Sequence, residues 1–264
     1  MPEHDPGPDR DLALLTEAAH RAGQIALHYW GHKPGVTEKP DGQGPVTEAD
    51  LAVNAMLEDT LRTARPDYGW LSEESPDDPA RLQCEHVFII HPIDGTRAFI
   101  DGDSSFSHSF AIARDGMVTA AVVYLPAKSR LYAASAAQTA RCDGQPIRPS
   151  ERREPDGATL LTSKAFIAPN HWIGPPPAVI RVFRASLAYR MCLVADGEFD
   201  GILSLRPTWE WDIAAGSLIA AQSGAQVTDR LGLPIVFNQA HPQANGLLAA
   251  NPGLHAALAA RLKP

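Results

Sequence analysis

The sequence predicts a protein of mixed α and β structure, with an α+β first half followed by an alternating α/β second half. In the first half, two helical patterns precede apolar runs that are separated by tight-turn dipeptides, which is typical of helices followed by hairpins. In the second half, short apolar runs alternate with helical patterns, as in α/β proteins. We therefore expect two domains, residues 1–150 and residues 151–264, joined near the charged segment 151–157.

Two helices are expected at the start of the chain. Apolar residues recur at helical spacing and predict an amphipathic helix over about residues 10–30. The segment 31–44 is rich in Gly, Pro and Lys and predicts a loop. Thr47 and Asp50 then form the pattern of a capping box, which predicts the start of a second helix.

A series of strands should follow these helices. The apolar run 87–90 predicts a buried strand, which the turn sequence Asp94-Gly95-Thr96 brings to an end. Asp115-Gly116 lies between two further apolar runs and predicts a hairpin. The other elements expected in this half are a strand over residues 130–134 and a tight turn at Asp143-Gly144.

The second half should alternate strands and helices. Ser186 can cap a helix that reaches about Ala195, Gly224 can end a helix that starts near Trp211, and Pro252 can open the last helix. The expected strands cover residues 160–162, 199–203 and 246–250.

Composition narrows the function classes. The 264 residues carry a formal net charge of −8, with 44% hydrophobic and 20% charged residues, which is ordinary for a globular protein. No segment is rich in Lys and Arg, so we expect no nucleic-acid polymer as a partner. No window reaches the roughly 20 apolar residues of a membrane span, so we expect no membrane partner. The N-terminal stretch lacks the apolar core of a signal peptide and the three cysteines are isolated, which predicts a cytoplasmic protein.

Three acidic clusters lie at the edges of expected elements. They are the pair Glu73-Glu74, Asp94 after the buried strand, and Asp212 at the start of a helical pattern. Carboxylate oxygens are the ligands that Mg²⁺ prefers, so a shared metal site is the chemistry that this pattern favours.

The same clusters resemble the motifs of the inositol monophosphatase superfamily, the lithium-sensitive, Mg²⁺-dependent phosphomonoesterases. The matching segments are Glu73-Glu74, His91-Pro92-Ile93-Asp94-Gly95-Thr96 and Trp211-Asp212-Ile213-Ala214-Ala215-Gly216, and their order and spacing also match. The resemblance implies a layered αβαβα sandwich of the inositol monophosphatase and fructose-1,6-bisphosphatase type, with the site between the two halves. It also implies a homodimer.

The resemblance assigns roles to individual residues. It implies that the metal ligands are Glu73, Asp94, Asp212, the carbonyl of Ile93 and the residue at position 91. It implies that Thr96 and Glu73 orient the attacking water, with Asp50 hydrogen-bonded to Thr96. The substrate-binding residues expected on this basis are Gly95, Thr96 and Lys39. Ser186 is a further candidate for substrate binding, and Arg206 is another because its charge could offset a second phosphate. Two simpler roles stay open, because Asp50 can complete the capping box and Lys39 can be a solvated loop charge.

One position departs from the family pattern. Where the family has an Asp that bridges two metal ions, this chain has His91. A neutral imidazole has one free lone pair and cannot bridge two ions in that way. It favours Zn²⁺, Co²⁺ or Ni²⁺ over Mg²⁺, so Mn²⁺ or Zn²⁺ could replace the magnesium of the family. The alternative is that His91 is a structural residue beside a weakened site.

The substrate is a small phosphorylated metabolite on this interpretation. Pro207 to Asp212 resembles a segment of bacterial 3′(2′),5′-bisphosphate nucleotidases, and Leu205 stands where inositol monophosphatases tend to have a sugar-binding Glu. The segment 184–188 lacks a Lys that those nucleotidases often have. We expect an enzyme that hydrolyses a bisphosphate nucleotide or an inositol or sugar phosphate by metal-activated water attack. The alternative is a catalytically impaired homologue that binds a phosphorylated metabolite without efficient turnover.

Overall fold

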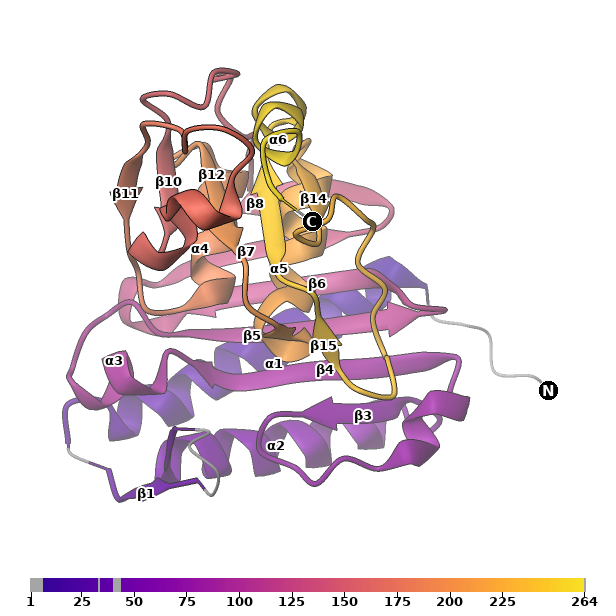
Figure 1. Cartoon of the computed structure of the whole chain (residues 1–264). Helices are drawn as coiled ribbons and strands as arrows, with labels where there is room; N and C mark the ends of the chain where they lie inside the picture. The colour runs from indigo at the N-terminus through magenta and orange to yellow at the C-terminus, as the bar shows by residue number, and fades with distance from the viewer. Residues whose placement is uncertain (1–6, 33, 40–43, 264) are drawn as a thin grey trace.

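The chain folds into five stacked layers, and the computed structural model describes residues 7–32, 34–39 and 44–263 of it. Helices α1 (Pro8–Tyr29) and α2 (Glu48–Ala64) cover one face of a seven-stranded sheet, and α4 (Leu187–Ala195) and α5 (Glu210–Ser223) cover the other (Figure 1). A five-stranded sheet lies beyond α4 and α5, with α6 (Pro252–Ala259) on its outer side. This arrangement confirms the expected αβαβα sandwich.

The seven-stranded sheet follows chain order. Its strands are β3 (Gly69–Ser72), β4 (His86–Asp94), β5 (Ser107–Arg114), β6 (Met117–Leu125), β7 (Arg130–Ser135), β8 (Gln138–Cys142) and β9 (Gln145–Pro146). Only the β3–β4 pair is parallel, and Asp115-Gly116 forms the hairpin turn that the sequence predicts. The segment 31–44 differs from the expected loop, because it holds β1 (Val36–Glu38), which pairs with β2 (Pro45–Thr47).

The five-stranded sheet brings distant segments together. Its order is β11 (Ile180–Val182), β10 (Thr159–Thr162), β12 (Gly201–Ser204), β16 (Leu247–Ala250) and β14 (Gln226–Thr228). Short strands β13 (Thr208–Trp209) and β15 (Gln243–Ala244) form a separate pair. Along the chain, the segment 151–157 connects β9, the last strand of the seven-stranded sheet, to β10, the first strand of the five-stranded sheet. The division into two domains stays a prediction.

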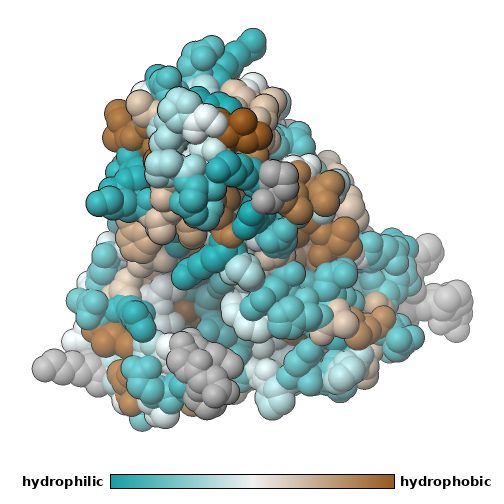
Figure 2. All heavy atoms as spheres, in the orientation of Figure 1, coloured by the Kyte–Doolittle hydropathy of each residue, from teal (hydrophilic) through white to brown (hydrophobic). Residues whose placement is uncertain are grey.

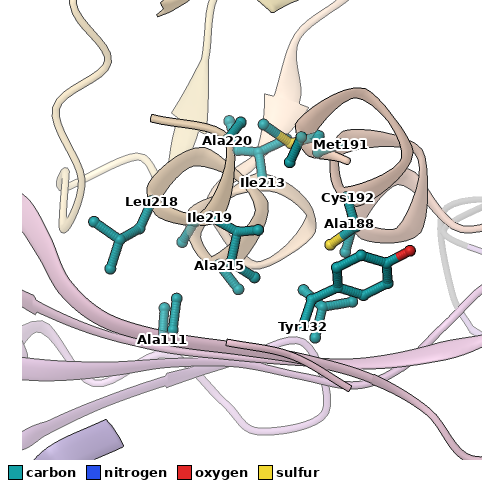
Figure 3. Packing of buried hydrophobic residues seen from close by; sticks show 14 of the residues in the cluster. Ala111, Tyr132, Ala188, Met191, Cys192, Ile213, Ala215, Leu218, Ile219 and Ala220 are labelled. Atoms are coloured by element: carbon teal, nitrogen blue, oxygen red, sulfur yellow. The ribbon is translucent and has the colours of Figure 1, made fainter. Parts of the chain in front are cut away.

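Two apolar layers flank the seven-stranded sheet. Residues of the sheet, α4 and α5 form one continuous cluster, so the two halves of the chain share a core (Figure 3). Figure 3 shows Ala215 and Ile219 of α5 above the sheet residue Ala111, with Met191 of α4 alongside. Gly216 permits this close packing, because a Cβ at that position would lie 2.7 Å from Met191 Cβ. The second cluster packs the opposite face of the sheet against α1 and α2.

Local signals in the sequence explain where the helices begin. Thr47 and Asp50 form the expected capping box of α2, and the hydroxyl of Ser186 caps α4 by accepting a hydrogen bond from the Tyr189 N–H. Most of the residues on the face shown in Figure 2 are polar. Among the described residues, no helix combines the length and the apolar character that a membrane span requires.

Candidate active site

A bulge in β4 brings His91 and Asp94 to the same face of the sheet. Residues three apart on a regular strand point to opposite faces, but the register with β5 shifts between these two residues. Ile90 and Ile93 therefore pack toward α1 and α2, whereas Asp94 turns toward α4. The irregular Pro92-Ile93 segment thus places two polar side chains, His91 and Asp94, on the same face at the end of a buried strand.

Glu73 approaches the same place from the end of β3. Its backbone N–H donates to the carbonyl of Ile90 on β4, which extends the parallel pairing by one residue. Lys39 Nζ lies 2.8 Å from Glu73 Oε1 and 2.7 Å from Glu74 Oε1. Burial raises the pKa of Glu73, but His91 and Lys39 outweigh it and lower the pKa to about 2. Glu73 is therefore a permanent carboxylate at neutral pH.

His91 lies between carboxylates from three elements. Its Nε2 is in direct contact with Glu73 Oε2, and its Nδ1 lies 3.1 Å from Asp212 Oδ1 and 4.0 Å from Asp94 Oδ1. Burial alone would lower the pKa of His91, but Glu73, Asp212 and Asp94 outweigh it and hold the pKa well above its usual value. These three carboxylates therefore favour the imidazolium form of the ring.

Asp94 and Asp212 complete the cluster. Asp94 Oδ2 accepts hydrogen bonds from Ser186 Oγ at 2.6 Å and from the Ala188 N–H at 2.7 Å, at the start of α4. Ser186 is completely buried, so it positions Asp94 and does not make the direct substrate contact that we expected. Asp212 lies in the first turn of α5, where a carboxylate is favoured by the helix dipole. The carboxylates of Glu73, Asp94 and Asp212 therefore converge on His91, from the residue after β3, from the end of β4 and from the first turn of α5.

The Gly95-Thr96 turn follows directly. Gly95 adopts a φ of 92°, which favours glycine, and Thr96 begins the short helix α3 (Thr96–Ile100). Thr96 Oγ1 donates to the carbonyl of Ile93 at 3.2 Å. Asp50 bonds Thr47, and its Oδ1 is buried without a hydrogen bond, so the expected bond between Asp50 and Thr96 is not formed.

Two arginines carry positive charge in this part of the structure. Arg206 is exposed, and nothing in the described structure tests its expected role. Arg190 was missed by the sequence argument; its Nε donates to the Ser186 carbonyl at 3.2 Å. Burial lowers the pKa of Arg190, while Asp94 and Asp212 raise it, which places its guanidinium near both carboxylates. A lone arginine in an otherwise apolar helix was the signal that could have revealed it.

The cluster fits one cation better than the two ions of the family. One ligand atom each from His91, Asp94 and Asp212 lies within 4.8 Å of the other two. Glu73 instead uses Oε1 for Lys39 and Oε2 for His91. A carboxylate with both oxygens in contact with nitrogen atoms is poorly available to a second ion.

The chain is similar to characterised proteins over nearly its whole length. It is 30% identical to the Nus factor SuhB of Salmonella typhimurium strain LT2, with 96% of this chain and 95% of that protein aligned. It is 29% identical to the inositol-1-monophosphatase of Rhizobium meliloti, with 84% of this chain and 86% of that protein aligned. The structure is similar to SuhB from Bartonella henselae, with a TM-score of 0.81, 25% identity, and coverage of 95% of this chain and 97% of that chain.

A second solved structure has the same fold. The IMPase from Thermotoga maritima matches with a TM-score of 0.80, 27% identity and 96% coverage of both chains. The family model described as the inositol monophosphatase family matches residues 8–263. Together with the three converging carboxylates, this match shows that the chain belongs to the inositol monophosphatase family.

Proposed function

We propose that this protein is a metal-dependent phosphatase that hydrolyses a small phosphomonoester. The observation that carries the proposal is the convergence of His91, Asp94 and Asp212, whose ligand atoms lie within 4.8 Å of one another beside the Gly95-Thr96 turn. A divalent cation bound there would neutralise phosphoryl oxygens and activate a water molecule.

The residues of the chain supply orientation. The N–H groups in the first turn of α3 have no partners within the helix, so they can bind phosphate oxygens. The Thr96 hydroxyl donates to Ile93 and keeps its lone pairs for a hydrogen bond from the attacking water. Glu73, with a pKa of about 2, is a weak proton acceptor at neutral pH and acts by orientation.

The substrate that best suits the surrounding side chains is a 3′(2′),5′-bisphosphate nucleotide. Trp209 and Trp211 stack with their ring centroids 4.7 Å apart, and His241 lies 5.6 Å from Trp209, so an aromatic surface adjoins Asp212. Aromatic side chains of this kind stack on nucleobases. Arg190 and Arg206 provide positive charge for a second phosphate.

A polyol substrate has fewer partners here. Leu205 is buried and apolar. Glu210 is buried and accepts hydrogen bonds from the backbone N–H groups of Asn238 and Gln239. Neither residue offers a free acceptor to a sugar hydroxyl, which supports the preference for a nucleotide.

Phosphate release from a substrate panel tests the proposal. The purified protein would be assayed with Mg²⁺, Mn²⁺, Zn²⁺ or chelator, and kcat/KM compared for adenosine 3′,5′-bisphosphate and inositol 1-phosphate. We expect metal-dependent release with a higher kcat/KM for the nucleotide, and loss of release in Asp212→Asn. Trp209→Ala should raise KM for the nucleotide and leave inositol 1-phosphate unaffected. A preference for inositol 1-phosphate would refute the nucleotide assignment, and release that needs no metal would refute the metal-dependent mechanism.

A second candidate is a protein that binds a phosphorylated metabolite without efficient turnover. Its specific support is that Lys39 and His91 already contact carboxylates that hold metal ions in the family. Several relatives carry the name Nus factor rather than the name of an enzyme, which is compatible with this candidate. Calorimetric binding of the nucleotide with no phosphate release under any metal would favour it. A homodimer and a cytoplasmic location stay predictions, and light scattering checks the first.

A further inference from the structure

His91 has one nitrogen directed at Glu73 and the other at the two aspartates. His91 is 6% exposed, and its buried Nδ1 lies 3.1 Å from Asp212 Oδ1. When the ring is neutral with its proton on Nε2, this nitrogen carries a lone pair that faces two carboxylate oxygens, and a cation between them would bind all three atoms. Its surroundings are those of a ligand atom in a metal site.

The spacing of the three candidate ligand atoms fits one ion. Nδ1 lies 3.1 Å from Asp212 Oδ1 and 4.0 Å from Asp94 Oδ1. Two ligands at about 2.0–2.1 Å from a tetrahedral zinc ion lie about 3.3 Å apart, so small side-chain movements are sufficient. Asp94 is already fixed by Ser186 and the Ala188 N–H through its other oxygen, which leaves Oδ1 directed at the cluster.

Glu73 is placed to orient His91 and not to bind the ion. Its Oε2 contacts Nε2, so a proton held on Nε2 leaves the Nδ1 lone pair directed at Asp94 and Asp212. Metal-binding histidines commonly donate their second N–H to a carboxylate in this way. Lys39 holds the other oxygen of Glu73 at 2.8 Å and thereby fixes that carboxylate.

We propose that the site binds a single divalent transition metal through His91 Nδ1, Asp94 and Asp212, with Glu73 as the positioning carboxylate of His91. This inference deepens the proposed function and rests on it only for the identity of the site. One imidazole and two carboxylates favour Zn²⁺, Co²⁺ or Mn²⁺ over Mg²⁺, which takes oxygen ligands and gives up its water reluctantly. The family's two-ion arrangement is replaced by one ion and a histidine.

The test is metal binding measured without substrate. Isothermal titration with Co²⁺ and Zn²⁺ would give the stoichiometry of the full-length protein, and X-ray absorption of the zinc form would report its ligands. We expect one ion per chain and one nitrogen ligand at about 2.0–2.1 Å. Asp212→Asn and His91→Asn should abolish this binding. Glu73→Ala should keep one ion but weaken its affinity by about 10–100-fold, as loss of an orienting partner does. His20→Asn, at an exposed histidine on α1, is the matched control and should bind normally.

Two results would overturn the inference. Two ions per chain, with one lost in Glu73→Ala, would show that Glu73 is a ligand. Absence of binding in the natural protein, with Mg²⁺ binding restored in His91→Asp, would show that the imidazolium itself is the cation of the site. Phosphate release measured in parallel separates the two proposals. One bound ion without hydrolysis refutes the proposed function alone, whereas hydrolysis supported by two ions refutes this inference alone.

Discussion

Replacement of His91 by Asp should make the stability of the protein depend on Mg²⁺. The imidazolium touches Glu73 and lies 3.1 Å from Asp212 and 4.0 Å from Asp94, so the substitution exchanges these attractions for repulsions. Two unit charges 4 Å apart interact by about 4 kcal/mol at an effective dielectric constant of 20. Relaxation and protonation reduce that figure, and loss of one partner from a buried pair typically costs about 3–5 kcal/mol. We therefore expect His91→Asp to be about 3–5 kcal/mol less stable than the natural protein in chelator.

Magnesium should recover much of this loss, because an Asp at position 91 provides the oxygen ligands that Mg²⁺ prefers. An ion present at 100 times its Kd contributes about 2.7 kcal/mol. For a chain of this size, that corresponds to a rise of roughly 5–10 °C in Tm. The assay is thermal unfolding in chelator and across a Mg²⁺ titration. His91→Asn is the matched control, since it removes the cation without adding a carboxylate, and it should be destabilised with little recovery. If Mg²⁺ stabilises the natural protein as much as His91→Asp, the electrostatic argument fails.

Three further outcomes follow from the structure. Thr96→Ala should lower kcat by about 10²–10⁴-fold, the usual scale of proton-transfer and orientation effects, while the dissociation constant of substrate changes little; an unchanged kcat would remove Thr96 from the mechanism. Burial lowers the pKa of His108 to about 4 from a usual value of 6.5, so the unfolded chain binds the extra proton first. Stability should consequently fall by up to roughly 3 kcal/mol as the pH drops from 6.5 to 4, and denaturant unfolding of His108→Asn should show a smaller fall. Gly216→Ala should destabilise the protein by about 1–3 kcal/mol through overpacking against Met191, and an unchanged denaturant midpoint would contradict the close packing of α4 and α5.

The elements that the sequence predicted are those specified by local chemistry. The capping box at Thr47 and the Ser186 cap place helix starts correctly, because each depends on residues within one turn. The Asp115-Gly116 turn does the same for a hairpin. The layered arrangement came from family resemblance, since periodicity does not say how strands from distant segments such as β14 and β16 pair.

In the site, too, local sequence predicted some features, whereas others depend on contacts between distant segments. The motif order predicted that Glu73, Asp94 and Asp212 would lie near one another, and all three carboxylates lie around His91. Their role as metal ligands stays a prediction. The β4 bulge could not be predicted, although it decides that His91 and Asp94 share a face. The contact of Lys39 with Glu73 and Glu74 could not be predicted from local sequence either, because Lys39 is 34 residues from Glu73 and 35 residues from Glu74 along the chain.

Lys39 and His91 supply positive charge to the carboxylates of the site without a metal ion. Buried carboxylates must be neutralised, and proteins that rely on metal ions for this purpose lose stability when the ions are removed. Here the ammonium and the imidazolium contact Glu73 on its two oxygens, and the imidazolium also faces Asp212 and Asp94. The cluster is therefore assembled before any ion binds. It follows that chelation should abolish activity while leaving the folded structure intact, whereas the same treatment of His91→Asp should affect both.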